Sequence, residues 1–274
     1  MIEVSGISTS LKKNLILKDI SFSVHPGEFI ALVGPNGAGK TTLLKHFNGL
    51  LKPDTGTVNV CGRDTRKSKT SELARLVGFL FQNPDQQILC QTVHAEIAFG
   101  LKYCGIPHGE WDERIEEAAS LVGLAEKLDA DPILLTRSRR QRVALASVLA
   151  TKPSILVLDE PTSAQDESET VRIMEVAEDY GAQGNTVFLV SHDMDLVARY
   201  AKRILLLING KIEADCPPAV FFAQKELLVR AHLVEPRIFA LANALGYPPA
   251  SIAESLTVEG LADFICDSGK KERI

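Results

Sequence analysis

Residues 34–41 carry the residue types that hold the phosphates of a nucleotide. They read Gly-Pro-Asn-Gly-Ala-Gly-Lys-Thr, the pattern GxxxxGK[ST], between an apolar run at 29–33 and a helix-like run at 41–47. Glycines let backbone N–H groups turn toward the α- and β-phosphates, the lysine reaches the β- and γ-phosphates, and the hydroxyl ligates Mg²⁺. The predicted binding residues are Gly34, Pro35, Asn36, Gly37, Ala38, Gly39, Lys40, Thr41 and Thr42.

A second set of reactive groups ends another apolar run. Residues 155–160 read Ile-Leu-Val-Leu-Asp-Glu, which predicts a buried strand followed by two adjacent carboxylates, Asp159 and Glu160. Because successive side chains of a strand point to opposite faces, Asp159 can address Mg²⁺ while Glu160 is aimed at an attacking water. Acidic pairs at strand ends are often only solvated caps, but the phosphate loop upstream favours the catalytic interpretation.

Composition narrows the class of protein. The 274 residues are 45% hydrophobic and 24% charged, which is enough for one large globular core with an appendage. A net charge of −5 argues against a protein that binds nucleic acid through an overall positive charge, although arginines cluster at 137–142. Five dispersed cysteines predict reduced thiols in a cytosolic protein. With no run near the ~20 apolar residues of a membrane helix, we expect any action at a membrane to go through partners.

The pattern of apolar residues predicts an α/β fold with a mainly parallel sheet. Continuous apolar runs at 29–33, 155–158, 187–190 and 204–208 are typical of strands buried on both faces, and helix-like stretches at 140–150 and 168–180 alternate with them. Residues 18–24 instead alternate apolar and polar side chains, and 55–60 resemble another short strand. These two segments predict an N-terminal antiparallel part.

Two helical regions flank this core in the prediction. Residues 84–150 form a helical subdomain inserted into an α/β core at 1–215, and residues 216–274 form a small C-terminal helical extension. The extension carries two apolar stripes at helical spacing, which either pack on the core or form a self-association surface. The stripes are Ile238, Leu241, Ala242, Leu245 and Val258, Leu261, Ala262, Ile265.

With these motifs in this order, residues 2–215 resemble the ABC-type ATPases. Gln82 follows the apolar run 77–81 and matches the Q-loop of that family, residues 161–166 match its D-loop, and Ser191-His192-Asp193 matches its switch histidine. The resemblance implies a P-loop NTPase fold that hydrolyses ATP with Mg²⁺. It implies catalytic roles for Glu160, His192 and Gln82, and metal contacts from Thr41, Gln82 and Asp159.

Within that family, residues 81–87, Thr92-Val93 and 96–100 look like the ATPases of energy-coupling factor importers, which take up vitamins and transition-metal ions. The tail after Pro218 is similar to their C-terminal extension, and another branch of importer ATPases is the alternative. The resemblance implies a peripheral protein at the cytoplasmic face of the membrane. Its partners would be a second ATPase subunit, an integral membrane coupling subunit and a substrate-binding membrane subunit, with Asp85 and Glu96 as acidic contacts or merely a solvated face.

The sequence departs from the family at the signature loop, normally LSGGQ, which contacts ATP on the partner subunit. This chain has Leu135-Thr136-Arg137-Ser138-Arg139 instead. Cβ atoms at 137 and 138 should obstruct the approach of backbone N–H groups to phosphate. We therefore expect a heterodimer whose partner carries a normal signature; in the alternative, Arg137 or Arg139 supplies the positive charge.

A second departure concerns adenine, because no aromatic residue near Ser10 is available to stack on the base. Together the two departures leave a rival interpretation, a regulatory subunit that binds ATP and hardly hydrolyses it. Intact Glu160 and His192 argue against that rival. A soluble ABC ATPase of translation or DNA repair is a further rival, but such relatives usually carry two cassettes or a long coiled-coil insertion, and neither is present in this sequence.

Overall fold

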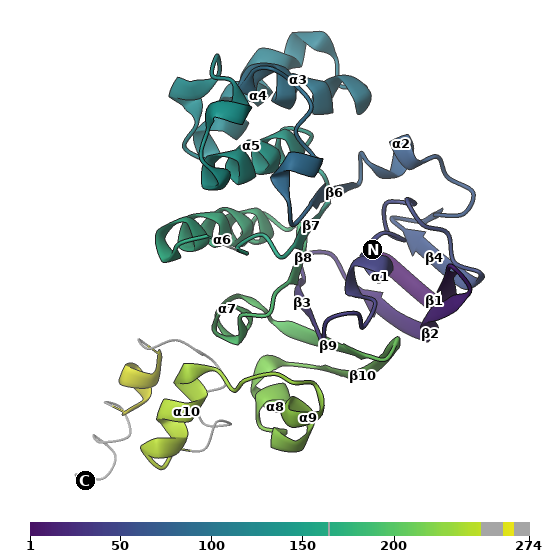
Figure 1. The fold of residues 1–274 in the computed structure, drawn as a ribbon, viewed down its shortest axis with the longest axis vertical. Coiled ribbons are helices and arrows are strands. Elements are labelled where there is room, and N and C mark those ends of the chain that lie inside the picture. The colour runs from purple at the N-terminus through teal and green to yellow at the C-terminus, as the bar shows by residue number, and fades with distance from the viewer. Residues whose placement is uncertain (164, 248–259, 266–274) are drawn as a thin grey trace.

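The computed structural model describes residues 1–163, 165–247 and 260–265. Its centre is a six-stranded sheet that runs through the middle of the molecule (Figure 1). Five neighbouring strands are parallel and the edge strand β10 pairs antiparallel with β9. In sheet order the strands are β10 (Lys211–Cys216), β9 (Arg203–Ile208), β3 (Phe29–Val33), β8 (Thr186–Val190), β7 (Ile155–Asp159) and β6 (Val77–Leu80).

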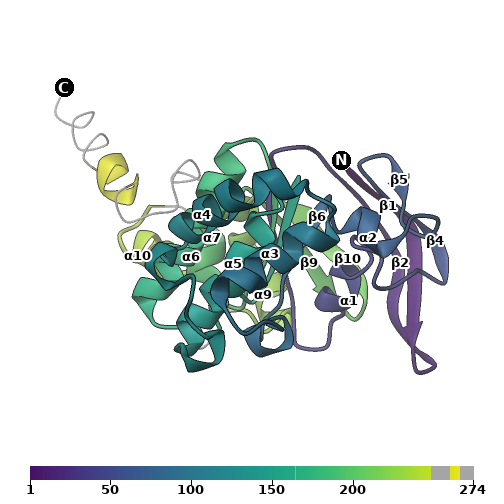
Figure 2. The same ribbon diagram turned by 90° about the horizontal axis from the view of Figure 1, so that it is seen from above.

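A second, antiparallel sheet lies at one side of the molecule (Figure 2). Its order is β2 (Asn14–Val24), β1 (Ile2–Leu11), β4 (Thr55–Val60) and β5 (Arg63–Asp64). The alternation predicted for residues 18–24 is present, because Ile20, Phe22 and Val24 are buried while Ser21 and Ser23 are exposed. The prediction of an α/β protein with an N-terminal antiparallel part is confirmed.

Helices cover the central sheet and form two lobes beside it (Figure 1). Residues 84–150, all of which the structure describes, contain helices and no strand. Within residues 1–163 and 165–247 the α-helices are α1 (Lys40–Leu44), α2 (Thr70–Leu73), α3 (Val93–Tyr103), α4 (Trp111–Leu121), α5 (Arg137–Leu149), α6 (Glu167–Ala182), α7 (Met194–Tyr200), α8 (Pro218–Phe222), α9 (Lys225–Arg230) and α10 (Arg237–Ala244).

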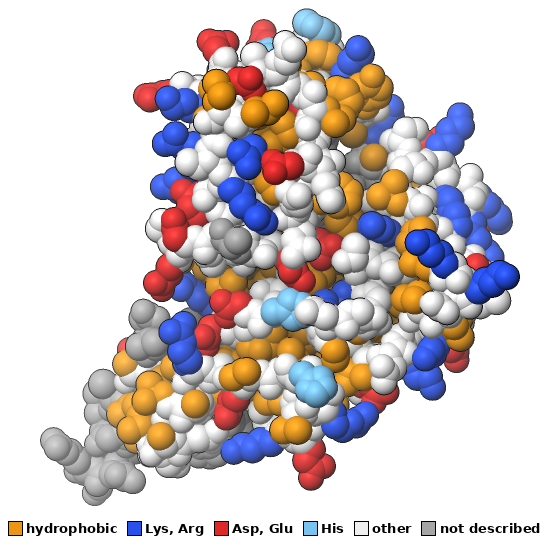
Figure 3. Space-filling model, in the orientation of Figure 1, with side chains coloured by type: hydrophobic (Ala, Val, Ile, Leu, Met, Phe, Trp, Pro, Cys, Tyr) orange, Lys and Arg blue, Asp and Glu red, His pale blue; other side chains and the backbone are white. Residues whose placement is uncertain are grey.

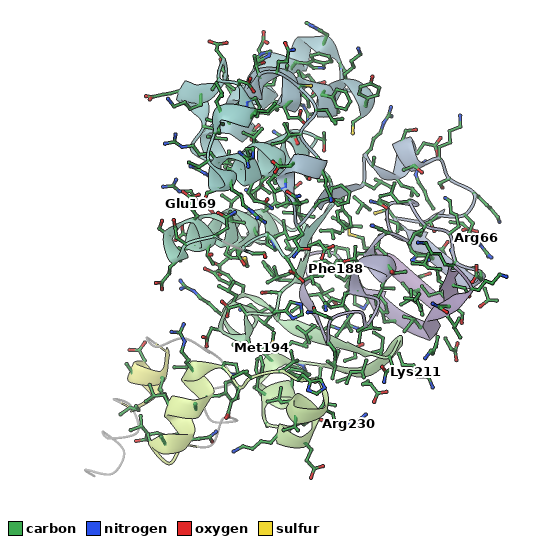
Figure 4. All side chains as sticks on the ribbon, in the orientation of Figure 1. Arg66, Glu169, Phe188, Met194, Lys211 and Arg230 are labelled. Atoms are coloured by element: carbon green, nitrogen blue, oxygen red, sulfur yellow. The ribbon has the colours of Figure 1, made fainter. Side chains whose placement is uncertain are left out.

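Both faces of the central sheet are buried, as its continuous apolar strands require. Ile155 and Val157 of β7 face the cluster shared with α1 and the antiparallel sheet, while Leu156 and Leu158 face the cluster built by α3 to α6. Phe188 of β8 (Figure 4) packs against Phe47 with the two rings tilted at 54° and their centroids 5.1 Å apart. The sheet is therefore fixed on both sides, and the loops at its ends are held by a rigid base.

The helix that follows the signature region begins at Arg137, three residues before the predicted start at 140. Four charged or polar residues in its first turn concealed this start in the sequence.

In the C-terminal extension, Ile238 and Ala242 of the first stripe are buried, whereas Leu241 and Leu245 are 46% and 51% exposed. Of the second stripe, Val258 lies outside the described residues. Among the described residues, no helix combines the length and apolar character needed to span a membrane.

Candidate active site

The motif residues lie at one edge of the central sheet because four neighbouring strands end there. Strands β3, β8, β7 and β6 are parallel, with Asp159 opposite Val190 and Leu80 opposite Leu158. The segments that follow them begin at Gly34, Ser191, Glu160 and Phe81. In open α/β sheets this carboxyl edge is where ligands bind. The strand order thus brings together motifs that are up to 158 residues apart, from Gly34 to His192.

The phosphate loop needs glycine at two positions that the backbone itself identifies. Gly34 has φ +143°, and a Cβ atom there would collide with the carbonyl oxygen of Leu207. Gly39 has φ +107°, and its Cβ would lie 2.9 Å from the Leu17 side chain. Both conformations are ones that residues with a side chain rarely adopt. The loop is therefore shaped by packing against β9 and β2 as well as by its own sequence.

The side chain of Lys40 is bonded to the backbone of its own phosphate loop. Its Nζ donates to the carbonyl oxygens of Gly34 at 2.7 Å and Pro35 at 3.1 Å, and the residue is only 7% exposed. Burial lowers the pKa of Lys40, and the charges of Glu160 and Asp159 act against that shift. An ammonium held beside two carboxylates at the mouth of a glycine loop is suited to receive phosphate oxygens.

Thr41 and Asp159 lie side by side at the start of α1 and the end of β7. The Thr41 hydroxyl donates to Asp159 Oδ2 at 2.8 Å. Burial raises the pKa of Asp159, whereas the hydrogen bond from Thr41 lowers it. Both side chains offer hard oxygen atoms as metal ligands. The described residues contain no group of three or more acidic, histidine or cysteine side chains that could hold a metal ion by themselves. One carboxylate and one hydroxyl suit Mg²⁺, which takes most of its remaining ligands from phosphate and water.

Glu160 is contacted by both of the other predicted catalytic residues. Its Oε2 accepts a hydrogen bond from Gln82 Nε2 at 2.6 Å, and its Oε1 lies 3.1 Å from His192 Nε2. The residue has φ +49°, in the left-handed region that a glutamate rarely occupies. Such strain persists where the surroundings fix the residue, here through its N–H, which donates to Val190 O at 3.0 Å. Gln82 bonds to Glu160 in this structure, and its role as a metal ligand stays a prediction.

A cavity of about 330 Å³ lies over the phosphate loop, lined by residues 36–42, Glu160 and Ile16. Sequence reasoning missed Ile16, since no motif contains it. Its aliphatic side chain packs beside Gly39 at the edge of this cavity. Ser10, near which the family commonly has an aromatic residue, is exposed, and its N–H donates to Asp54 Oδ2 at 2.7 Å.

The altered signature segment starts α5 and is tied to the Q-loop. Thr136 is the N-cap, and its hydroxyl accepts a hydrogen bond from Arg139 N at 3.3 Å. Arg140 contacts Asp85 Oδ1 at 2.7 Å and donates to Leu135 O at 2.7 Å. The Gln141 side chain donates to Phe81 O at 3.2 Å. Sequence reasoning missed these links, because nothing in the spacing pairs residues 85 and 140.

The structure corrects the expectation that Glu96 lies on the surface, either as an acidic contact or on a solvated face. Glu96 is 3% exposed, and its Oε2 accepts hydrogen bonds from the backbone of Leu89 and Cys90 at 2.8 Å each. A carboxylate bound to two backbone donors shapes its own loop and is not free for a partner. Asp85 remains on the surface but is paired with Arg140.

Comparison with known proteins agrees with this geometry. The ABC transporter family model matches residues 17–163. An energy-coupling factor transporter ATP-binding protein of Methanocaldococcus jannaschii is 39% identical over 84% of this chain and 83% of its own. The structure of cbiO1 from Clostridium perfringens, part of the ABC transporter complex cbiONQ, superposes with a TM-score of 0.75 at 30% identity, covering 88% of this chain and 98% of that one.

The protein therefore belongs to the ABC transporter family, and it carries the ATP-binding and ATPase domain of that family. Within the family it resembles the energy-coupling factor ATPases, as the sequence predicted. A relative in Caldanaerobacter subterraneus, provisionally named an ABC transporter ATP-binding protein, is 42% identical over 88% of this chain. The chain spans 42% of the length of that relative.

Proposed function

We propose that this protein is the ATP-hydrolysing subunit of an energy-coupling factor type importer of a vitamin or transition-metal ion. The observation that carries the proposal is the contact of Gln82 and His192 with the two carboxylate oxygens of Glu160, beside the phosphate loop. Relatives named energy-coupling factor ATP-binding proteins, at 37–39% identity, support the importer class.

In the proposed reaction ATP is held by the loop 34–42, with Lys40 turning its ammonium from the loop carbonyls to the β- and γ-phosphates. Glu160 orients the attacking water and accepts its proton, and His192 contacts the γ-phosphate. Gln82 reports the state of the nucleotide to the membrane partner. Such catalysis rests on positioning and charge stabilisation, since phosphoryl transfer needs little covalent help from the protein. Thr41 and Asp159 would hold Mg²⁺, which neutralises phosphate charge when bound.

The membrane partner would dock in an apolar groove beside the Q-loop. This groove of about 340 Å³ is lined by Val77, Phe79, Phe81 and Phe99, with Leu50 at its edge. Phe99 is 36% and Leu50 49% exposed, and Figure 3 shows hydrophobic side chains at this edge of the helical subdomain. The groove is next to Gln82, so an inserted helix could sense the nucleotide site. It supports a peripheral location at the cytoplasmic face of the membrane.

For the second ATPase subunit we propose a heterodimer. Residues 135–139 contain no glycine. The Thr136 hydroxyl already accepts a hydrogen bond from Arg139 N as the N-cap of α5, and Arg137 and Ser138 lie within that helix. Backbone donors at this helix start are therefore screened by side chains, which makes the chain a poor signature donor. The rival, a regulatory subunit with little hydrolysis, needs Glu160 to be idle.

The test of the catalytic site is Glu160→Gln in the purified complex. We expect turnover to fall at least about 100-fold, because the base is lost while its shape is kept. ATP binding should be nearly unchanged, whereas Lys40→Ala should weaken binding itself. Glu175→Gln, an exposed carboxylate on α6, is the matched control and should leave both quantities unaltered. Parental turnover in the Glu160 variant would remove the proposed base and favour the regulatory rival.

A further inference from the structure

The helix that follows His192 shares its core with the C-terminal extension. Met194 and Val197 of α7 are 5% and 0% exposed, and they belong to the same buried cluster as Phe239 and Ala242 of α10. Met194 lies where α7 meets the C-terminal helices (Figure 4). Because protein interiors are close-packed, a shift of α10 must be transmitted to α7.

A single carboxylate joins these two helices at their N-terminal ends. Asp195, in the first turn of α7, accepts the backbone N–H of Arg237 at 2.7 Å and its Nε at 2.6 Å. Arg237 is the first residue of α10. A carboxylate is stabilised near the N-terminus of a helix, and here one carboxylate lies near two. The Arg237 side chain is 89% exposed, so this link lies on the surface and can be changed without opening the core.

From α7 the contacts continue to the catalytic carboxylate. The Asp193 side chain caps α7 by accepting from Asp195 N at 2.9 Å and Leu196 N at 3.2 Å. The preceding residue is His192, whose Nε2 lies 3.1 Å from Glu160 Oε1. Arg237, Asp195, His192 and Glu160 all line one cavity of about 600 Å³. The C-terminal extension thus reaches the wall of the catalytic site.

We propose that Arg237 is a positioning residue for ATP hydrolysis. Through Asp195 it fixes the N-terminal end of α7, and so holds His192 against Glu160 in the geometry that the γ-phosphate meets. The hydrogen bonds of Arg237 go to Asp195, and it acts on Glu160 only through α7 and His192. The inference rests on the proposed role of His192, and it adds that the C-terminal extension controls the rate of the site.

The test is a double-mutant cycle on kcat and KM in the complete complex. Arg237→Ala should lower kcat about 5-fold, the low end of coupling between sites, with KM for ATP unchanged. Arg237→Lys should restore most of the rate. In a His192→Ala background, Arg237→Ala should cost nothing further, because the residue through which it acts is gone. Asp195→Asn should behave like Arg237→Ala.

Arg230→Ala is the matched control. Arg230 also lies in the C-terminal extension and forms an exposed ion pair, with Glu213 at 3.0 Å, away from α7 (Figure 4). It should leave kcat unchanged and shift the melting temperature as much as Arg237→Ala does. The inference would be overturned, with the proposed role of His192 untouched, if Arg237→Ala lowered kcat equally in the parent and in the His192→Ala background. A loss of kcat in Arg230→Ala equal to that in Arg237→Ala would overturn it in the same way. An unaltered kcat in His192→Ala would instead overturn the proposed role of His192, and the inference with it.

Discussion

At the scale of single residues, each charged group of the site is paired with another group of the protein. Lys40 bonds to two carbonyls of its own loop, Thr41 to Asp159, and Glu160 to Gln82 and His192. A buried charge without such partners would be costly. In the proposed reaction a bound nucleotide would exchange these contacts for its own, and Gln82 and His192 would signal that exchange through their change of partner.

Another residue-scale feature, His46, gives a pH-dependent prediction. The imidazole is fully buried between Thr9 Oγ1 at 2.9 Å and Thr42 O at 2.7 Å. Burial is the main cause of a pKa below the ordinary value of 6.5, although the bond to Thr42 acts against it. As pH falls below 6.5 the unfolded chain binds a proton that the folded protein does not. The free energy of unfolding should therefore decrease until the lower folded pKa is passed.

Urea denaturation at about pH 7.5 and about pH 5.5 measures this loss on either side of the ordinary histidine pKa. His46→Gln, which cannot titrate, is the comparison, since the other histidines and carboxylates remain. The variant should lose less stability than the parent between the two pH values. A parallel loss in both proteins would show that His46 does not contribute to the acid sensitivity.

At the scale of elements, the accuracy of the sequence prediction follows from the burial pattern. The run 29–33 and the segment 55–60 coincide with β3 and β4 at their first and last residues. These bounds could be predicted because turn residues flank each segment. The prediction did not include β1, whose pairing with β2 shifts register between Val4 and Ile7 and so breaks strict alternation. Nor did it include β10, a half-exposed edge strand with few apolar residues. Motif spacing identified Glu160, His192 and Gln82, but their contact depends on strand order, which no local pattern contains.

The link between the Q-loop and α5 gives a prediction at the same scale. Asp85 pairs with Arg140, and the side chains are 56% and 22% exposed. If Asp85 acts only within the chain, Asp85→Ala and Arg140→Ala should each lower stability by about 0.5–1 kcal/mol, and the double variant should lose little more than either. Capture of the membrane subunit should fall equally for both. A loss of capture confined to Asp85→Ala would assign Asp85 to the partner interface.

At the scale of the whole molecule, the phosphate loop and the signature segment lie in different lobes. The loop is in the central core, while α5 belongs to the helical subdomain (Figure 1). In a head-to-tail dimer, as the family resemblance implies, each ATP would be held by the core of one subunit and the signature of the other. The two halves of this chain would then serve two different sites, and the altered signature lies in only one of them.

The last prediction follows from that asymmetry. With a partner that carries a normal signature, the site containing Lys40 and Glu160 of this chain is complete, and the opposite site contains Thr136-Arg137-Ser138. Glu160→Gln here should then remove most ATPase activity of the complex, by at least about 100-fold in the complete site, and the same change in the partner should matter much less. Steady-state ATPase assays of the two single variants measure this difference. Equal losses, or rapid hydrolysis by this chain as a homodimer, would show that Arg137 and Arg139 serve as a working signature.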